Sequence, residues 1–293
     1  MTETSALDAR RDQLPNAADG TARPAVDATP PWPIEVVDGV AVTTMTGTPA
    51  NCQNEAFYAA LHATLDRLDD EHRDRPVVLT GEGRSFSAGL DVRYVGELFR
   101  DGDHDALLAW KDRYFATNLR LFALDRPLVA AVNGHAYAGG LITALCADLR
   151  IGARGPARFA LNEVPIGIPM PRTYLELLAS AIGWPTASRL SLLGTELDVE
   201  AAHRIGVLDE VCDPAALVSR AIAEAARLAG GSLPAFRFTK RAVRAPVLGR
   251  MHEAAAGADR AFVDVVRSPE SRRAIERLLA TLDARATGTT CSR

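Results

Sequence analysis

The sequence predicts an α/β fold with parallel β-strands, on the strength of two observations. Short, almost wholly apolar runs alternate along the chain with longer stretches whose apolar residues recur at spacings of three and four. The short runs are typical of strands buried on both faces, and the longer stretches are typical of helices that cover such a sheet. A chain of 293 residues, 47% of them hydrophobic, is long enough for one large domain or for one domain with an appendage.

The first part of the chain divides into an arm and a hairpin. Residues 1–33 are expected to form a disordered arm, because they contain five of the 17 prolines and few large apolar side chains. Order is expected from Ile34, where two β-prone runs flank Asp38-Gly39, a strong signal for a hairpin.

The predicted helices and strands then follow in alternation. Apolar residues between 54 and 68 mark one buried helix face, and the short apolar run 76–81 ends in glycine and predicts a buried strand. Four further elements repeat this pattern: a helix over 106–124, a strand over 128–132, a helix over 139–147 and a strand over 149–151.

The chain is expected to be mostly helical after Arg172. The predicted last helix, residues 268–285, carries one apolar stripe, which must pack on the protein's own core or on a partner subunit. The stripe consists of Ile275, Leu278, Leu279 and Leu282.

Composition excludes several classes of protein. The net charge of −4 leaves no basic excess for a phosphate backbone, so nucleic acid is not an expected partner. The uncharged stretch 127–147 has Asn133, His135 and several glycines in its middle, which argues against a membrane span. The four cysteines form no C-x-x-C pair and the six histidines show no ligand spacing, so we expect no metal site and a reducing, cytoplasmic location.

Two glycine-bearing turns between a strand and a helix start are candidates for stabilising negative charge. They cover Gly83–Asp91 and Asn133–Leu141. At such turns the first N–H groups of the helix are free, and the helix dipole adds partial positive charge. Two donors of this kind can hold one developing oxyanion, although two ordinary strand-to-helix turns would give the same pattern.

Glu163 is the candidate acid–base group. It stands among apolar residues in the segment Leu161–Pro169, just before another helix. A carboxyl group that loses hydration has a raised pKa and can move protons near neutral pH. A helix-capping or surface glutamate is the alternative interpretation.

Taken in order, these three segments resemble the crotonase superfamily, also called the enoyl-CoA hydratase/isomerase family. The resemblance extends from about Ile34 to Val211 and is carried by Phe86–Asp91, by Ala131–Asp148 and by Asn162-Glu163 with Gly167. It implies a spiral of ββα units with a C-terminal helical segment, acyl-coenzyme A thioesters as substrates, and no cofactor besides the coenzyme A of the substrate.

The resemblance also implies roles for individual residues. The backbone N–H groups of Leu90 and Gly139 are expected to form the oxyanion hole for the thioester carbonyl. The expected substrate-binding residues of the first turn are Ser87, Ala88, Gly89 and Asp91.

One departure from the family pattern separates its reactions. Enoyl-CoA hydratases have a second glutamate three residues beyond the second oxyanion glycine, and Ile142 stands there in this chain. Adding water engages two carboxylates, whereas shifting a double bond needs one proton moved between C2 and C4. The pattern is similar to that of the Δ3,Δ2-enoyl-CoA isomerases, so the expected reaction converts a 3-enoyl-CoA to a 2-enoyl-CoA with Glu163 as the acid–base group.

Other functions remain open on the sequence alone. They are a hydratase or another crotonase-type enzyme that recruits a spare acid, and an acyl-CoA binder without turnover. The candidate spare acids are Asp91, Glu97 and Asp103.

Assembly into trimers or hexamers is also implied by the resemblance. The chain is divided accordingly into the arm 1–33, a crotonase-like core 34–230, and a C-terminal helical segment 231–293 that mediates self-association, because monomers seldom tolerate an exposed apolar stripe. Lys240 and Arg241 in that segment are candidates for attracting the phosphates of coenzyme A.

Overall fold

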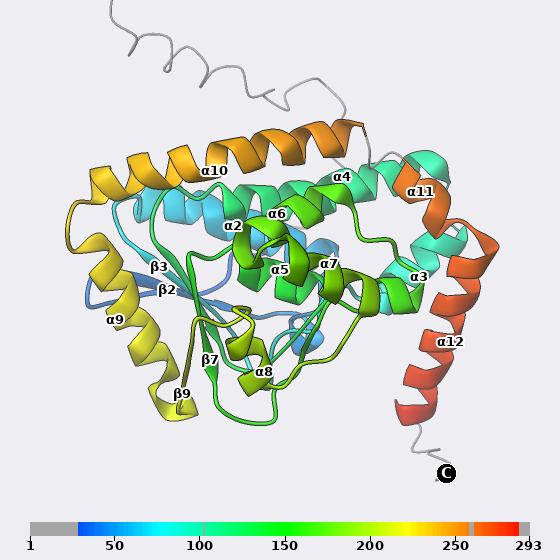
Figure 1. Cartoon of the computed structure of the whole chain (residues 1–293), viewed down its shortest axis with the longest axis horizontal. Coiled ribbons are helices and arrows are strands. Elements are labelled where there is room, and N and C mark those ends of the chain that lie inside the picture. The colour runs from blue at the N-terminus through cyan, green and yellow to red at the C-terminus, as the bar shows by residue number, and fades with distance from the viewer. Residues whose placement is uncertain (1–28, 102, 258–260, 287–293) are drawn as a thin grey trace, which may run out of the picture.

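A six-stranded sheet runs through the structure, a computed structural model that describes residues 29–101, 103–257 and 261–286 (Figure 1). The strand order is β1-β2-β3-β5-β7-β9, and every neighbouring pair is parallel except β1 with β2. The predicted parallel α/β fold is therefore confirmed. The strands are Ile34–Val37 (β1), Val40–Met45 (β2), Val77–Gly81 (β3), Leu128–Val132 (β5), Leu149–Ala153 (β7) and Glu210–Cys212 (β9).

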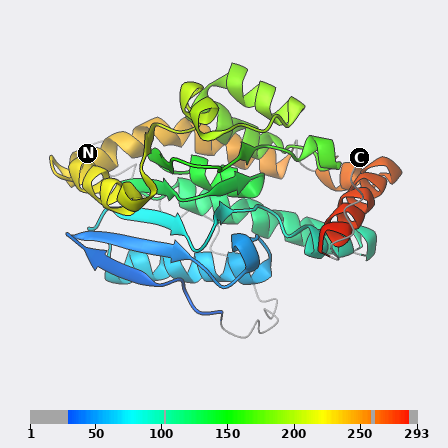
Figure 2. The same ribbon diagram turned by 90° about the horizontal axis from the view of Figure 1, so that it is seen from below.

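Strands β1 and β2 form the predicted hairpin at the edge of this sheet, drawn in blue in Figure 2. Asp38 and Gly39 have φ values of 50° and 81°. A two-residue hairpin turn of this kind requires positive φ at both positions, which Asp and Gly tolerate. The local sequence therefore determines where the chain reverses.

Three strands of the large sheet are each followed by a strand of a second, smaller sheet. β4 (Ser85–Ser87) follows β3, β6 (His135–Tyr137) follows β5, and β8 (Phe159–Ala160) follows β7, and they pair in parallel in the order β4-β6-β8. Helices then return the chain to the large sheet, which gives the ββα spiral. Strands β4 and β6 lie in the two segments predicted as turns, because strands this short show no alternating pattern.

Helices cover both faces of the six-stranded sheet. On one face Leu217, Ala221 and Ala225 of α9 pack against apolar side chains of β2, β3 and β5. A larger core lies on the other face under α2, α4 and α6, and α10 runs alongside α4 and α6 (Figure 1). The longer helices are Glu55–Glu71 (α2), Val92–Asp101 (α3), His104–Phe122 (α4), Arg172–Ile182 (α6), Trp184–Leu193 (α7), Leu217–Ala229 (α9), Leu233–Ala256 (α10) and Pro269–Ala286 (α12). The shorter ones are Gly139–Leu145 (α5), Val199–Arg204 (α8) and Ala261–Val266 (α11), with single turns at Pro49–Asn51 (η2), Val164–Ile166 (η3) and Pro214–Ala216 (η4).

Helices α2 and α4 begin at capping residues. Asn54 Oδ1 accepts a hydrogen bond from the Phe57 N–H (3.2 Å), and Asp103 Oδ1 accepts one from the Ala106 N–H (2.7 Å). The predicted apolar face of α2 is buried, which confirms the periodicity in that stretch. Within the described ranges, no helix is long and apolar enough to cross a membrane.

The predicted boundary of the N-terminal arm at residue 33 is wrong. Trp32 is only 1% exposed, and the centroids of its ring and the Phe57 ring are 5.0 Å apart. The backbone N–H of Trp32 donates to Thr64 Oγ1 (2.8 Å). One large aromatic side chain docked on α2 orders this end of the proline-rich segment. Residues 1–28 of the predicted arm lie outside the described residues.

The apolar stripe of α12 packs on its own chain at Ile275 and Leu279, the first of the two expected partners. A Cβ at Gly96 of α3 would lie 3.0 Å from Leu279 Cδ1 and 3.4 Å from Ile275 Cγ2, so α12 approaches α3 closely there. Ile275 is 3% exposed. Helix α12 also packs on η3, and a Cβ at Gly167, directly after η3, would lie 2.8 Å from Ala274 Cβ.

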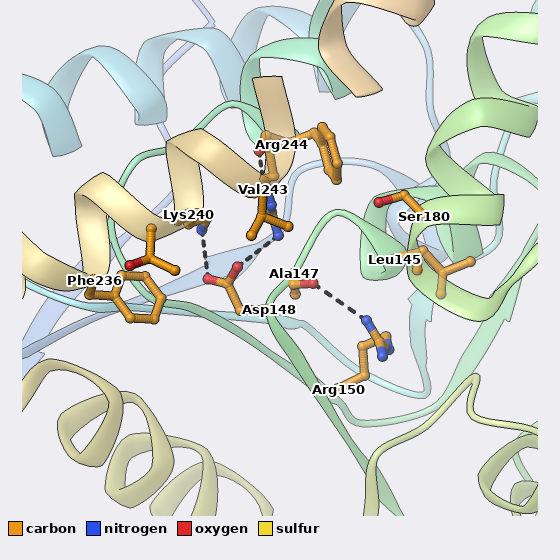
Figure 3. Close-up of a pocket in the computed structure, with 12 residues that line it drawn as sticks. Leu145, Ala147, Asp148, Arg150, Ser180, Phe236, Lys240, Val243 and Arg244 are labelled. Atoms are coloured by element: carbon orange, nitrogen blue, oxygen red, sulfur yellow. Dashed lines mark hydrogen bonds and ion pairs between the residues drawn. The ribbon is translucent and has the colours of Figure 1, made fainter. Parts of the chain in front are cut away.

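Asp148 joins helix α10 to the sheet. Its carboxylate accepts hydrogen bonds from Lys240 Nζ (2.6 Å), from Arg244 Nη2 (2.7 Å), and from the Leu128 N–H at the start of β5 (2.8 Å). These charged side chains line a cavity of about 320 Å³, drawn in Figure 3. Burial lowers the pKa of Lys240 to about 8, although the carboxylate of Asp148 opposes the shift.

Lys240 is therefore an internal ion-pair partner of Asp148, and attraction of the coenzyme A phosphates by Lys240 stays a prediction. It is 7% exposed and also donates to the Arg126 carbonyl oxygen (2.7 Å). Arg241 lies further out and pairs with Asp125.

Replacing Asp148 should uncouple α10 from the sheet. Asp148→Asn leaves Lys240 and Arg244 buried without a counter-charge, so we expect the free energy of unfolding to fall by ~3–5 kcal/mol in urea denaturation followed by circular dichroism. The matched control is Asp125→Asn, which removes a more exposed partner of the same helix and should cost less than about 1 kcal/mol. Equal small losses in both variants would show that Asp148 does not hold α10.

Candidate active site

The small sheet brings the three predicted site segments to one edge. Leu90 follows the end of β4, Gly139 follows the end of β6, and Glu163 follows the end of β8. The strands are parallel, with Ser87 opposite Ala136 and Tyr137 opposite Ala160. Parallel strands end at the same side of a sheet, so this pairing places the oxyanion candidates and the acid–base candidate together.

The two glycine-bearing turns touch each other. A Cβ at Gly89 would lie 3.1 Å from the Gly139 nitrogen and 2.4 Å from the Tyr137 carbonyl oxygen. A Cβ at Gly140 would lie 2.2 Å from the Ser87 carbonyl oxygen. Gly89 also has φ of 78°, which L side chains rarely adopt. Glycine is therefore required at both positions for Leu90 to reach Gly139.

The amides of Leu90 and Gly139 are free to bind a ligand oxygen. Gln53 pairs with the first turn on either side of Leu90: its N–H donates to the Gly89 carbonyl (2.8 Å), and its carbonyl accepts from the Asp91 N–H (3.0 Å). In such a parallel bridge the N–H of Leu90 points away from Gln53. Gly139 is the first residue of α5, and neither amide donates a hydrogen bond to any other described residue.

Glu163 is buried without a partner for its carboxylate. The residue is 3% exposed, and neither side-chain oxygen has a hydrogen-bond partner among the described residues. Burial raises the pKa of Glu163 from 4.5 to about 8, against a smaller opposite effect of the residue's own backbone. The backbone carbonyl of Glu163 accepts from the Ile166 and Ile168 N–H groups (3.1 and 2.9 Å), which fixes the turn that carries it.

Tyr114 links the oxyanion side of the site to the acid side, and sequence reasoning missed it. Its hydroxyl lies 2.9 Å from the position of a Cβ at Gly139. Burial raises the pKa of Tyr114 well above its ordinary value, and the charges of Tyr174 and Glu163 add to the shift. The available signal was the aromatic pair Trp110 and Tyr114, four residues apart on one helix face, whose rings stack at 5.4 Å.

The structure assigns supporting contacts to two of the predicted substrate-binding residues. Ser87 Oγ donates to the Asn51 carbonyl (2.8 Å) and accepts from the Gly89 N–H (3.2 Å). Asp91 Oδ1 caps α3 by accepting from the N–H groups of Arg93 and Tyr94 (3.1 and 3.3 Å). Both side chains thus shape the first turn. Substrate contacts of Ser87, Ala88, Gly89 and Asp91 stay a prediction.

The other candidate acids lie elsewhere or serve other roles. Ile142 is fully buried in α5, Asp103 caps α4, and Glu97 is exposed on α3. Across the described ranges, no three His, Cys, Asp or Glu side chains are grouped so that they could hold a metal ion. Among the candidate acids, Glu163 is the one that is buried without a hydrogen-bond partner among the described residues, and it follows the strand that pairs with β6.

Comparison with known proteins connects this geometry to one family. Residues 35–286 match the family model for enoyl-CoA hydratase/isomerase. The chain is 36% identical over 188 residues to a probable enoyl-CoA hydratase of Mycobacterium bovis, and 34% identical over 175 residues to the mitochondrial enoyl-CoA delta isomerase 1 of Mus musculus. These alignments cover 62% and 59% of this chain and 65% and 59% of the relatives, so less than two thirds of either relative is spanned.

Solved structures of both kinds share the fold. Human mitochondrial delta3-delta2-enoyl-CoA isomerase is similar with a TM-score of 0.77 and 28% identity, over 84% of this chain and 95% of that one. A probable enoyl-CoA hydratase of Mycobacterium tuberculosis is similar with a TM-score of 0.71 and 29% identity, over 79% of this chain and 96% of that one. The choice between the two reactions therefore rests on the residues of the site.

Stability should depend on pH through Glu163. Burial raises the pKa of Glu163 in the folded state from 4.5 to about 8. The contribution of the neutral Glu163 carboxyl to the free energy of unfolding is therefore fully present below pH 4.5 and is lost as the pH rises through about 8. We expect the free energy of unfolding to fall from about pH 5 to about pH 8, and Glu163→Gln to make this fall smaller, because the amide does not ionise.

Urea titrations at the two pH values check this expectation. Glu97→Gln is the control, since Glu97 is exposed on α3 and should leave the pH dependence of the wild type in place. An unchanged fall in Glu163→Gln would mean that another group produces the pH dependence.

Proposed function

The chain belongs to the enoyl-CoA hydratase/isomerase family, and we propose that within this family it moves the double bond of an enoyl-CoA from C3 to C2. The observation that carries the proposal is one buried carboxylate, Glu163, which has no hydrogen-bond partner among the described residues and lies at the same edge of the small sheet as the free amides of Leu90 and Gly139. Ile142 occupies the position of the second acid, and its side chain has no group that can hold or deprotonate water.

The proposed reaction needs one base and one oxyanion hole. The Glu163 carboxylate takes a proton from C2 of the 3-enoyl thioester, and the electron pair of the broken C–H bond moves toward the thioester oxygen. The N–H groups of Leu90 and Gly139 stabilise the resulting dienolate. The protonated Glu163 then returns the proton to C4, so the double bond ends between C2 and C3 and atoms and charge balance.

The raised pKa of Glu163 suits both halves of this reaction. A carboxyl group with a pKa of about 8 is a stronger base than an exposed glutamate, and it gives up its proton again near neutral pH. The reaction consumes no redox equivalent or metal, so we propose that coenzyme A enters only as part of the substrate.

We also propose that the protein self-associates, as trimers or hexamers. Several large apolar side chains are exposed on α7 and α10: Trp184 (46%), Leu192 (66%), Leu193 (63%), Phe238 (75%) and Val243 (65%). Exposed apolar side chains that form a contiguous patch are typical of protein–protein contacts, and Leu192 and Leu193 are neighbours on α7. Closed rotational symmetry would bury these side chains in equivalent contacts on each subunit.

The substrate assay separates the candidate reactions. The protein is incubated with 3-enoyl-CoA and, separately, with 2-enoyl-CoA, and the products are analysed by mass. We expect isomerisation without a change of mass, and Glu163→Gln should lower turnover by a factor on the order of 10² or more while thioester binding persists. The control Glu97→Gln should turn over like the wild type.

Three other outcomes of this assay would contradict the proposed isomerase reaction. Efficient addition of water by the wild type would favour a hydratase, and near-normal turnover of Glu163→Gln would remove this residue from the mechanism. Binding without any conversion would favour an acyl-CoA binder.

Light scattering on the intact protein tests the proposed assembly. We expect a mass that is a multiple of three chains, as the family resemblance implies, and the exposed apolar side chains on α7 and α10 are the proposed contacts. The double substitution Leu192→Glu and Phe238→Glu should lower that mass by introducing charge into the contact. A monomeric wild type would contradict the proposal.

A further inference from the structure

We propose that Gln53 is a positioning residue that sets the separation of the two oxyanion amides, Leu90 and Gly139. The inference rests on the proposed thioester chemistry of the site, and it assigns the geometry of the oxyanion hole to one side chain outside both turns. Gln53 is 1% exposed and precedes the cap of α2.

The backbone of Gln53 holds the first turn. Its N–H and C=O bond to Gly89 and Asp91, the residues that flank Leu90, at 2.8 and 3.0 Å. These two hydrogen bonds, one before and one after Leu90, restrict rotation of the peptide plane that carries the Leu90 N–H. The direction of the Leu90 N–H therefore follows the position of Gln53.

The side chain of Gln53 holds the second turn. Its Nε2 donates to Thr143 Oγ1 (2.9 Å), one turn along α5 from Gly139. Its Oε1 lies 2.3 Å from the position that a Cβ at Gly139 would occupy, so the amide fills the space beside that glycine. Through one residue, the start of α5 is thereby tied to the loop that carries Leu90.

A chain of buried hydrogen bonds fixes which way the Gln53 amide faces. The Tyr114 carbonyl can only accept, so the Tyr174 hydroxyl donates to it (2.9 Å) and must itself accept from Asn118 Nδ2 (3.1 Å). The Thr143 hydroxyl has one proton and two acceptors within reach, Asn118 Oδ1 (3.0 Å) and the Gly139 carbonyl (2.9 Å), and neither of these oxygens can donate. Because the single proton of the Thr143 hydroxyl goes to an acceptor, Thr143 Oγ1 accepts a hydrogen bond from Gln53 Nε2. The other atom of that amide, Gln53 Oε1, therefore faces Gly139.

Packing alone does not account for a glutamine here. Gln53 Oε1 is buried and has no hydrogen-bond partner among the described residues. Leaving such an acceptor unpaired costs ~1–3 kcal/mol, a cost that an apolar side chain of similar volume would avoid. The buried carbonyl instead lies beside Gly139, whose backbone N–H donates to no other described residue.

The separation of the two amides matters because both must point at one oxygen atom. A misplacement of about 1 Å in a catalytic group can cost ~10²-fold in rate. Loss of the Gln53–Thr143 link should therefore weaken binding of the enolate more than binding of the ground-state thioester.

The test removes the link from either end. Gln53→Met keeps the side-chain volume and loses the amide, and Thr143→Val loses only the hydroxyl. Each variant should lower kcat by ~10–10²-fold with KM changed by less than about threefold, and the double variant should be no worse than the more damaged single variant. Thr143→Ser, which keeps the hydroxyl, should recover most of the kcat that Thr143→Val loses.

A spectroscopic readout separates positioning from mere stability. Acetoacetyl-CoA bound in an oxyanion hole ionises to an enolate with its own ultraviolet absorption, and its apparent pKa reports the strength of the hole. Gln53→Met and Thr143→Val should raise that apparent pKa relative to the wild type, and Thr143→Ser should not. This titration requires no double-bond shift, so it is read out even if the wild type does not isomerise 3-enoyl-CoA.

Three outcomes would overturn the inference. One is an unchanged kcat and enolate pKa in folded Thr143→Val, which carries the test alone if Gln53→Met does not fold. Another is an equal loss in Thr143→Ser and Thr143→Val, because the hydroxyl would then be irrelevant. The third is a wild-type protein without an enolate signal, because there would be no oxyanion hole for Gln53 to set.

Discussion

Parallel pairing of the three short strands β4, β6 and β8 is the constraint on which the site depends. Each strand is at most three residues long, yet each ends just before a functional segment. Because the pairing is parallel, Leu90, Gly139 and Glu163 emerge at one edge although they are distant in the sequence. Gly89 and Gly140 make the close approach between the first two strands sterically feasible, since a Cβ at either would collide with the backbone opposite.

Burial then gives these groups their chemistry. The same enclosure that leaves the Glu163 oxygens without partners raises the pKa of that carboxyl to about 8. Helix α12 contributes to this enclosure, because it packs on η3, directly after Glu163, and on Gly96 of α3. On the far side of the core, the ion pairs of Asp148 hold α10 against the ends of β5 and β7. The stability of the fold and the reactivity of Glu163 are therefore coupled, because the same tertiary packing that stabilises the fold also keeps water away from the Glu163 carboxyl.

The sequence predicted those features whose physical cause is local. The Asp38-Gly39 turn, the face of α2 and the free helix start at Gly139 follow from neighbouring residues, and the structure contains each of them. Features caused by contacts distant in sequence were missed or wrong. Trp32 docks on Phe57, and Ile275 packs against Gly96, pairings that no periodicity encodes. Gln53 and Tyr114 escaped notice for the same reason, because only the fold brings them to Gly139.

The central claim is that one buried carboxylate both removes and returns the proton. The most direct measurement is conversion of a 3-enoyl-CoA in deuterium oxide, with deuterium at C4 of the product determined by mass spectrometry. Because Glu163 is 3% exposed, the proton taken from C2 should be delivered to C4 before it exchanges with solvent, and most product molecules should carry no deuterium at C4. A product with one deuterium at C4 in nearly every molecule, or one that has gained a molecule of deuterated water, would contradict the account.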